Sequence, residues 1–260
     1  MPRFKLRLEY AGTRYSGWQI QKNARTVQGE LDRAVREVTG ERAFELYGAG
    51  RTDAGVHALG QVAHLDLRMG LPPATLVRRV NELLPADINL LAAEAVPHRF
   101  HARHTALART YVYQIARRRT AFAKPFVWWV KEDLDAAAMQ QAARAFTGRR
   151  DFHGFTDDDP NEKSTVVEVA SVDVRPHADA LLVVVEGSHF LWKMVRRMVG
   201  VLVEIGKGGL ASDTVPRLLA DPGGLPAALT APASGLFLAR VTYPGDAPGD
   251  PPLPPAVGSS

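Results

Sequence analysis

The sequence predicts an α+β protein made of two tandem ferredoxin-like (split βαβ) units, with antiparallel or mixed sheets side by side and a central basic cleft. Two observations support this prediction. The elements expected in the first part of the chain follow the order β-α-β-β-α-β. The second part repeats much of this order, and the helix ends expected at Thr39-Gly40 and Thr147-Gly148 lie 108 residues apart.

The first half, residues 1–103, is predicted to carry four strands and two helices. Apolar and polar residues alternate over 4–10, which is typical of a strand with one buried face. Thr26 can cap a helix that carries apolar residues on one face and ends at Gly40. The remaining elements are strands near 43–47, 61–67 and 88–96, and a helix between Pro72-Pro73 and Pro85.

The second half, residues 104–244, is predicted to begin between His98 and Thr105. Its expected elements are strands at 110–116, 166–175, 181–186 and 235–243, and helices at 134–147 and 190–205. The remaining residues, 245–260, are mostly proline, glycine and small residues, which cannot bury a core. We expect this tail to be flexible.

Composition limits the class of protein. The 260 residues are 46% apolar and 23% charged, as in a soluble folded protein, and no run of eighteen apolar residues occurs. The N-terminal residues lack the apolar stretch of a secretory signal, so we expect a cytoplasmic protein without a membrane segment. The chain has no cysteine, which excludes disulfides and thiol catalysis and makes a structural zinc site improbable.

Positive charge is concentrated near the expected boundary between the halves. The net charge is only +4, but residues 95–131 contain no Asp or Glu. This segment carries Arg99, Arg103, Arg109, Arg117, Arg118, Arg119, Lys124 and Lys131, interleaved with Phe100, Tyr111, Tyr113, Phe122 and Phe126. Cations with flat apolar rings suit RNA, whose phosphates and splayed bases they can contact. A solvated basic face is the simpler alternative.

The glycine-rich segment 48–55, GAGRTDAG, is the strongest candidate for a functional turn. It fits neither phosphate-binding pattern, because no Lys follows the last glycine and an Asp stands where a dinucleotide fingerprint needs glycine. A structural Asx-turn at Asp53 is the alternative. However, Arg51 lies two residues from Asp53 and can keep its carboxylate ionised. His57 and His64 match no common metal-ligand spacing and have no third ligand nearby in the sequence.

These residues resemble a known family. GAGRTDAGVHALGQVAHLDL (48–67) closely resembles the signature of the tRNA pseudouridine synthase A family, and the likeness continues through almost all of the chain except the tail. The supporting segments are YAGTRYSGWQIQ (10–21), TVQGELDRAV (26–35), RTYVYQI (109–115), DFHGF (151–155), FLWKMVRRMVG (190–200) and GLFLARVTYP (235–244). The chain departs from the family pattern at Arg150, Trp192-Lys193 and Arg197, where we expect added charge on the side that substrate approaches.

The resemblance implies an isomerase that converts uridine to pseudouridine in the tRNA anticodon stem-loop by base flipping. Asp53 would be the catalytic aspartate, Tyr111 would contact the target base, Arg51 would help displace that base, and Arg196 would pair with Asp53. Among the cations, Arg99, Arg103, His104, Arg109 and Lys163 are the expected RNA contacts. The reaction has no redox step and loses no net bond, so no metal or other cofactor is expected. The family also implies a homodimer.

Two other functions compete with this one. A non-catalytic RNA-binding module would explain the basic charge, but binding alone does not require a carboxylate in the turn, because an added carboxylate weakens phosphate affinity. A nuclease would need clustered carboxylates for divalent ions, and the only dense cluster is Asp157-Asp158-Asp159. That cluster precedes Pro160 in an expected loop, where solvated turn charge is the simpler interpretation.

Overall fold

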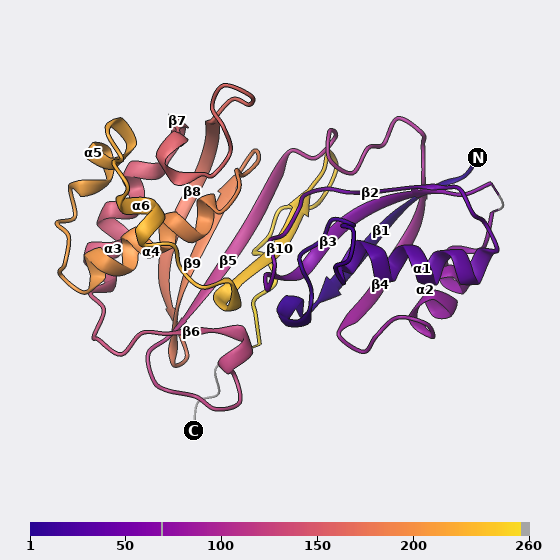
Figure 1. Ribbon diagram of the computed structural model, residues 1–260, viewed down its shortest axis with the longest axis horizontal. Helices are drawn as coiled ribbons and strands as arrows, with labels where there is room; N and C mark the ends of the chain where they lie inside the picture. The colour runs from indigo at the N-terminus through magenta and orange to yellow at the C-terminus, as the bar shows by residue number, and fades with distance from the viewer. Residues whose placement is uncertain (69, 256–260) are drawn as a thin grey trace. The chain divides into compact units, whose positions relative to one another are not determined.

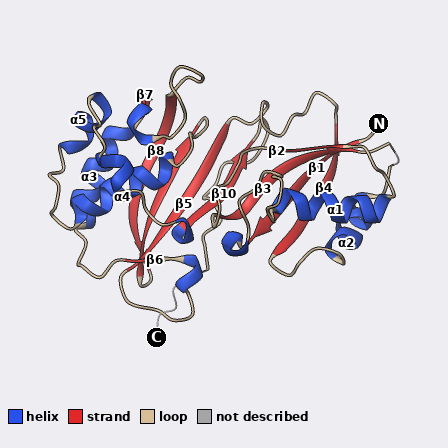
Figure 2. Cartoon of the chain, viewed as in Figure 1, coloured by secondary structure: helices blue, strands red, loops and turns tan. Residues whose placement is uncertain are grey.

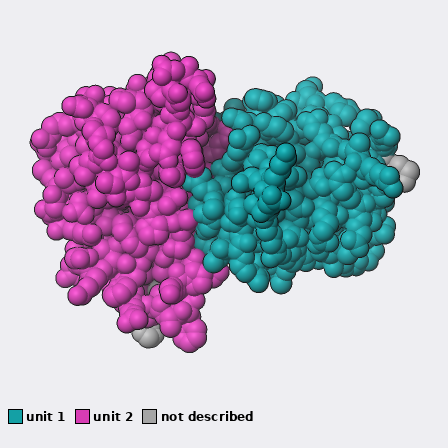
Figure 3. Space-filling view, in the orientation of Figure 1, with its two compact units in different colours: residues 1–107, 238–252 teal, residues 108–237, 253–260 magenta. Residues whose placement is uncertain are grey.

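The computed structural model describes residues 1–68 and 70–255 and divides the chain into two compact units. The first unit comprises residues 1–107 and 238–252, and the second comprises residues 108–237 with the described residues from 253 on (Figure 3). From the sequence, we predicted the division between residues 103 and 104, with residues 104–244 forming the second half. In the structure the division falls between Leu107 and Ala108, and residues 238–252 group with the first unit.

The first unit contains the expected β-α-β-β-α-β order of elements (Figure 1). The elements are β1 (Arg3–Tyr10), α1 (Val27–Thr39), β2 (Glu45–Gly48), β3 (His57–Asp66), α2 (Pro73–Asn81) and β4 (Ile88–Val96). Strand β1 pairs antiparallel with both β3 and β4, and β2 pairs antiparallel with β3. The last strand of the chain, β10 (Leu236–Thr242), also lies beside β3.

Local sequence signals explain these elements. Thr26 Oγ1 accepts a hydrogen bond from the Gly29 N–H at 3.2 Å and caps α1, and Gly40 ends the helix with a φ of 70°. Alternate residues of β1 are buried, as the sequence pattern predicted. Helices α1 and α2 contact each other, and α2 packs on β4, so both cover the same part of the sheet (Figure 2).

The second unit combines a sheet of order β5-β9-β8-β7 with several helices (Figure 1). Its strands are β5 (Ala108–Ala116), β6 (Trp128–Trp129), β7 (Gly148–Asp151), β8 (Val166–His177) and β9 (Ala180–Gly187). Its helices are α3 (Ala136–Ala143), α4 (Met194–Gly206), α5 (Thr214–Ala220) and α6 (Leu225–Ala228). The mixed α+β class is confirmed, whereas the description of the units as tandem ferredoxin-like folds stays a prediction.

Both long helices of the second unit are shorter than the sequence predicted. Asp135 caps α3 by accepting hydrogen bonds from the N–H groups of Ala137 and Ala138, both at 2.9 Å, and the helix continues only as a 3₁₀ turn over Arg144–Phe146. Helix α4 was expected from Phe190 but begins at Met194, because Lys193 adopts a left-handed conformation with a φ of 62°. A residue in this region cannot continue a right-handed helix.

The C-terminal tail contacts the rest of the chain over its described part. The Arg240 guanidinium donates hydrogen bonds to the carbonyl oxygens of Gly249 and Asp250 at 2.5 and 2.6 Å. Residues 256–260 of the expected flexible tail lie outside the described residues. Within the described part of the chain, no helix is both long and apolar enough to cross a membrane.

Candidate active site

The glycine-rich turn joins β2 to β3 in the first unit, and hydrogen bonds hold its backbone along its whole length. The Ala49 N–H donates to Val62 O at 2.7 Å, and the Gln61 side chain donates to Gly50 O at 3.0 Å. Further along, the Val56 N–H closes the turn onto Asp53 O at 3.1 Å. The turn is therefore fixed in position rather than a loose connection between strands.

A second segment, residues 10–18, is bonded to this turn although it lies far from it in sequence. The Trp18 N–H donates to Thr52 O at 3.1 Å, and the Gly55 N–H donates to Tyr15 O at 3.3 Å. The Gly12 N–H donates to His57 Nδ1 at 3.0 Å. Two of the family-like motifs, in residues 10–21 and 48–67, are thus parts of one interlocked structure.

Close backbone contact explains two glycines of that second segment. A Cβ on Gly12 would lie 1.9 Å from Val56 O, and a Cβ on Gly17 would lie 2.5 Å from Thr52 O. Gly17 also has a φ of +87°, a conformation that side-chain-bearing residues rarely adopt. Any larger residue at either position would push the two segments apart.

The fixed backbone leaves the candidate side chains at the surface of the first unit. Arg51 and Ala54 are exposed, and Asp53 is partly exposed, whereas Thr52 between them is buried. Asp53 is therefore a partly exposed residue of the turn rather than a part of its buried interior. Gly55 has a φ of +79°, a backbone conformation that glycine adopts readily and other residues rarely do.

The second unit carries the other residues that the resemblance implied. Tyr111 and Tyr113 both lie on β5 and, two residues apart, on the same face of the sheet. Tyr113 is completely buried, and its hydroxyl donates to Pro232 O at 2.7 Å. Tyr111 retains 8% of its exposure and packs edge-on against Phe190 with ring centroids 5.2 Å apart. Of the two tyrosines, only Tyr111 keeps any exposed surface in this chain.

Arg196 lies in the first turn of α4, half-buried. Its Nε donates to Ala231 O at 2.7 Å, and its own carbonyl accepts from the Ala231 N–H at 3.1 Å. Gly200 makes this close approach possible, because a Cβ there would lie 1.7 Å from Leu229 O. The helix is therefore seated against the backbone of 229–231, and this contact fixes Arg196.

Arg197 does not add charge to the surface, contrary to the expectation from sequence. The residue is 5% exposed, and its guanidinium donates to Thr156 O at 2.6 Å and pairs with Asp157. Lys193 Nζ lies 2.6 Å from the same Asp157 carboxylate. Hydrogen bonding from Lys193 and the nearby charge of Arg197 hold the pKa of Asp157 below its usual value.

The three consecutive aspartates, 157–159, are not merely charged residues of a solvent-exposed turn. Asp158 accepts from Lys163 Nζ at 2.9 Å and from the Trp192 N–H at 3.1 Å, so it ties this loop to the start of α4. Asp159 accepts from the Asn161 N–H at 2.8 Å. Because cations and backbone N–H groups occupy these carboxylates, the cluster does not have the form of a divalent-ion site for a nuclease.

The expected RNA contacts differ in their accessibility. Arg99, Arg103 and His104 are exposed on the segment after β4. Lys163 is 45% exposed and paired with Asp158. Arg109 is only 8% exposed and donates to Ser188 O at 2.8 Å, a position that does not favour contact with a phosphate. Their roles in RNA binding stay predictions.

One group of possible metal ligands occurs among the described residues, formed by Glu45, His64 and His101. His64 Nδ1 accepts from the Ala102 N–H at 3.2 Å, and His101 Nδ1 accepts from the Arg103 N–H at 3.1 Å. In the neutral rings the Nε2 atoms therefore carry the protons, and His64 Nε2 donates to Glu45 at 3.0 Å. A metal ion would have to displace these hydrogen bonds, so we interpret the group as a hydrogen-bonded cluster. His57 and His64 both lie on β3 and are buried.

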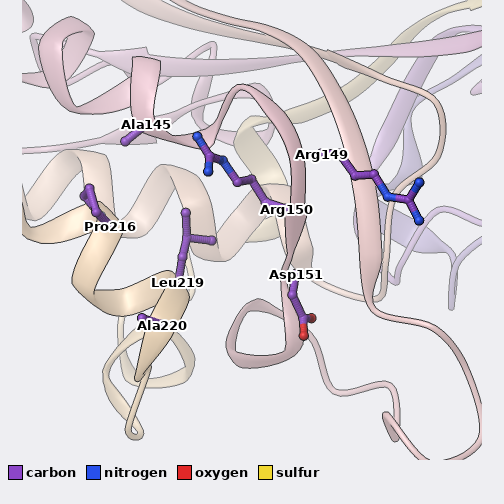
Figure 4. Close-up of a pocket in the computed structure, with 7 residues that line it drawn as sticks. All are labelled: Ala145, Arg149, Arg150, Asp151, Pro216, Leu219 and Ala220. Atoms are coloured by element: carbon purple, nitrogen blue, oxygen red, sulfur yellow. The ribbon is translucent and has the colours of Figure 1, made fainter.

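A pocket of about 430 Å³ lies elsewhere in the second unit, between β7 and α5 (Figure 4). Its lining consists of Ala145, Arg149, Arg150, Asp151, Pro216, Leu219 and Ala220. Arg150 extends toward Ala145, whereas Arg149 and Asp151 point away from α5. None of the candidate catalytic or RNA-binding residues lines this pocket.

Comparison with known proteins gives consistent matches along the chain. A family model described as tRNA pseudouridine synthase matches residues 8–104 and 142–244. A protein named tRNA pseudouridine synthase A from Rhodopseudomonas palustris (strain BisA53) is 43% identical over 246 residues, covering 94% of this chain and all of that protein. A protein of the same name from Syntrophotalea carbinolica is 43% identical over 241 residues, covering 92% of this chain and 95% of that protein.

Among solved structures, a chain in the crystal structure of a Cbf5-Nop10-Gar1 complex matches 76% of this chain and 54% of its own length. It is 11% identical with a TM-score of 0.32, a similarity too low to support an argument about this protein.

Proposed function

Because this chain belongs to the tRNA pseudouridine synthase family, we propose that the turn at Asp53 is where it isomerises uridine to pseudouridine in tRNA. The protein is an isomerase. The observation that carries the assignment of the site is the form of the turn, whose backbone is fixed by hydrogen bonds while the Asp53 side chain remains partly exposed. A turn with a purely structural role has no need to present a carboxylate in this way.

The reaction defines what Asp53 has to do. The C1′–N1 glycosidic bond breaks, the uracil turns, and a C1′–C5 bond forms. C5 loses its proton and N1 gains one, so atoms are conserved and no redox cofactor takes part. A carboxylate held near C1′ or C6 can act as nucleophile or base while the freed uracil is retained. A target base inside a stem-loop must first leave the stack, at a cost of about a few kcal/mol.

The other site residues complete this proposal. Arg51, exposed two residues before the carboxylate, would help to displace the base. Tyr111 would contact the flipped base, since aromatic rings stack on bases with little dependence on sequence. Pairing of Arg196 with Asp53 would keep the carboxylate ionised. Arg99, Arg103 and His104 would contact the phosphates, with smaller roles for Arg109 and Lys163.

Three finer statements also belong to the proposal. The target uridines would lie in the anticodon stem-loop, the reaction would take place in the cytoplasm where tRNA is found, and the enzyme would act as a homodimer. Each rests on the resemblance to the family. The exposed cations on residues 99–104 favour a polyanionic substrate such as tRNA.

The decisive test is the activity of the Asp53→Asn variant. We expect unmodified protein and a tRNA transcript to form pseudouridine in the presence of EDTA, detected as a reverse-transcription stop after carbodiimide treatment. Asp53→Asn should abolish the product and leave tRNA binding intact. The control Asp32→Asn changes a carboxylate that pairs with Arg36 on the surface of α1 and should leave the product unchanged.

The same experiment separates the alternatives. If the unmodified protein binds tRNA without forming pseudouridine, it is a binding module rather than an enzyme. If EDTA stops the reaction or the transcript is cleaved, a metal-dependent activity is present. If Asp53→Asn remains active, the carboxylate of the turn is not the catalytic group, and the family activity must depend on another residue.

A further inference from the structure

A chain of three buried polar side chains lies directly beneath the turn that carries Asp53. The exposed fractions are 4% for Tyr10, 5% for Thr52 and zero for Gln61. The Tyr10 hydroxyl lies 2.9 Å from Thr52 Oγ1, and Gln61 Nε2 lies 3.4 Å from the Tyr10 hydroxyl and 3.0 Å from Gly50 O. The chain therefore touches the turn at two points, Gly50 and Thr52, which flank Arg51.

The direction of the two hydrogen bonds from Gln61 follows from the chemistry of its amide. Gln61 Oε1 accepts from the Val62 N–H at 3.2 Å, so its amide nitrogen faces Gly50 and Tyr10. An amide nitrogen only donates, so the Tyr10 oxygen accepts from Gln61, whereas either oxygen can donate in the bond between the Tyr10 hydroxyl and Thr52 Oγ1. Burial raises the pKa of Tyr10 to about 12, so the hydroxyl keeps its proton at neutral pH.

Packing alone does not account for these three residues. Buried hydroxyl and amide groups are unfavourable unless they are hydrogen-bonded, and apolar side chains could fill the same volume. Here the bonds link β1, through Tyr10, and β3, through Gln61, to the two residues on either side of Arg51. Their common effect is to fix the backbone from Gly50 to Thr52, to which Asp53 is directly attached.

We propose that Tyr10 and Gln61 are positioning residues for Asp53, acting through Thr52 and Gly50 to hold the carboxylate in place for the reaction. The inference rests on the proposed role of Asp53. Neither side chain touches substrate in this scheme, because both are buried beneath the turn. Loss of either one should lower the rate of the chemical step and leave the affinity for tRNA nearly unchanged.

The test compares variants that remove a buried hydrogen bond in different places. Tyr10→Phe and Gln61→Leu remove bonds to the turn. Tyr243→Phe is the matched control, because its hydroxyl donates to Ala102 O at 2.6 Å, it is 4% exposed, and it lies in the same unit. Gln28→Leu is the second control, because the Gln28 side chain donates to Leu46 O at 2.9 Å in β2.

We expect kcat for pseudouridine formation to fall by about 10- to 100-fold in Tyr10→Phe and Gln61→Leu, since small displacements of a catalytic group have effects of this order. KM should change by less than about twofold, as expected when an interaction acts only in the transition state. The two control variants should keep kcat within about twofold of the unmodified protein at saturating tRNA.

Substitutions at Thr52 provide a test that does not depend on the folding of the other variants. Thr52→Ser keeps the hydroxyl that is hydrogen-bonded to Tyr10, and Thr52→Val removes it at nearly the same volume. We expect Thr52→Ser to retain kcat and Thr52→Val to lose it to the same degree as Tyr10→Phe. Equal activity of Thr52→Ser and Thr52→Val would overturn the proposal.

The remaining outcomes distinguish this inference from the proposed function. If Asp53→Asn is inactive while folded Tyr10→Phe keeps its kcat, Asp53 is catalytic and the positioning role is wrong. The positioning role is also wrong if Tyr243→Phe loses as much kcat as Tyr10→Phe, since the loss would then reflect general destabilisation. If Asp53→Asn is active, the proposed function of the turn fails first.

Discussion

Replacement of Arg197 by Met should destabilise the second unit strongly, although the residue is polar. The guanidinium donates to Gly154 O and Thr156 O and pairs with Asp157, and only 5% of the residue is exposed. Methionine has a similar length but no donor, so the two carbonyl groups would lose their partner and Asp157 would keep only Lys193. Hydrogen bonds from a charged group contribute about 1.5–3 kcal/mol each, and an acceptor left without a partner costs a similar amount, so we expect a loss of about 3 kcal/mol in the free energy of unfolding.

The expected loss can be measured by urea unfolding followed by circular dichroism and by thermal unfolding. A loss of this size corresponds to a decrease in Tm of about 10 °C for a protein of this length. Arg217→Met is the matched control, because Arg217 forms an i,i+4 pair with Asp213 on the surface of α5 and its side chain is 71% exposed. Exposed pairs contribute about 0–1 kcal/mol, so this variant should unfold almost like the unmodified protein.

The pH dependence gives a second check on the same ion pair. Bonds from Lys193 and the charge of Arg197 lower the pKa of Asp157 in the folded state. The carboxylate therefore stabilises the fold above the ordinary Asp pKa of about 4, and this contribution disappears as the pH falls through the lower folded-state value. Asp157→Asn should consequently lose stability relative to the unmodified protein at pH 7 but not at strongly acid pH.

Two results would refute this reasoning. If the free energy of unfolding of Arg197→Met lies within about 1 kcal/mol of that of the unmodified protein, the guanidinium does not stabilise residues 154–157 as we infer. If Arg217→Met is destabilised to the same extent, the loss comes from removing any arginine rather than from removing a buried guanidinium.

Two further predictions concern the turn and its substrate. Gly17→Ala should lower both stability and pseudouridine formation, because its Cβ would meet Thr52 O at 2.5 Å. Gly40→Ala is the control, because Gly40 has a similar φ but no heavy atom of the described residues within 4 Å of its Cβ position. This control should lose only about 1–2 kcal/mol of unfolding free energy and keep activity. Urea unfolding and the product assay check both, and an active Gly17→Ala would contradict the close contact. Arg103→Glu should weaken tRNA binding and reduce its salt dependence in a filter-binding titration. The control is Arg79→Glu, on the exposed face of α2. Equal effects of the two variants would show that only net charge matters.

The regular elements were largely predictable from sequence because their signals are local. Helix α1 was predicted from Val27 to Thr39 and is found there, because the Thr26 cap and Gly40 act on the helix ends directly. The predicted start of α4 was wrong because the true start depends on residues distant in the sequence. Asp158 accepts from the Trp192 N–H, and Lys193 turns into the left-handed region, and neither effect can be recognised in the apolar pattern of the helix.

The candidate site was only partly predictable for the same reason. Asp53 could be singled out by its neighbours in the sequence, but Tyr10 and Gln61 could not, because they meet the turn only after the strands pair. Their one local signal is a polar group at a buried position of a strand, because Tyr10 continues the alternate buried positions of β1 and Gln61 lies between buried residues of β3. Arg197 was misplaced because a cation next to Arg196 on a helix suggests solvent, whereas its partner Asp157 lies forty residues earlier.

The positions of the glycines show how the two motifs depend on each other. In the structure, a Cβ on Gly50 would meet no heavy atom of the described residues within 4 Å, and a Cβ on Gly48 would lie 2.5 Å from Trp18 Nε1. The glycines of the other motif that contact the backbone of the turn are Gly12 and Gly17. A bulkier residue at Gly12 or Gly17 therefore displaces the turn from outside, although neither glycine belongs to it. For this reason we expect the geometry of Asp53 to depend as strongly on residues 10–18 as on its own motif.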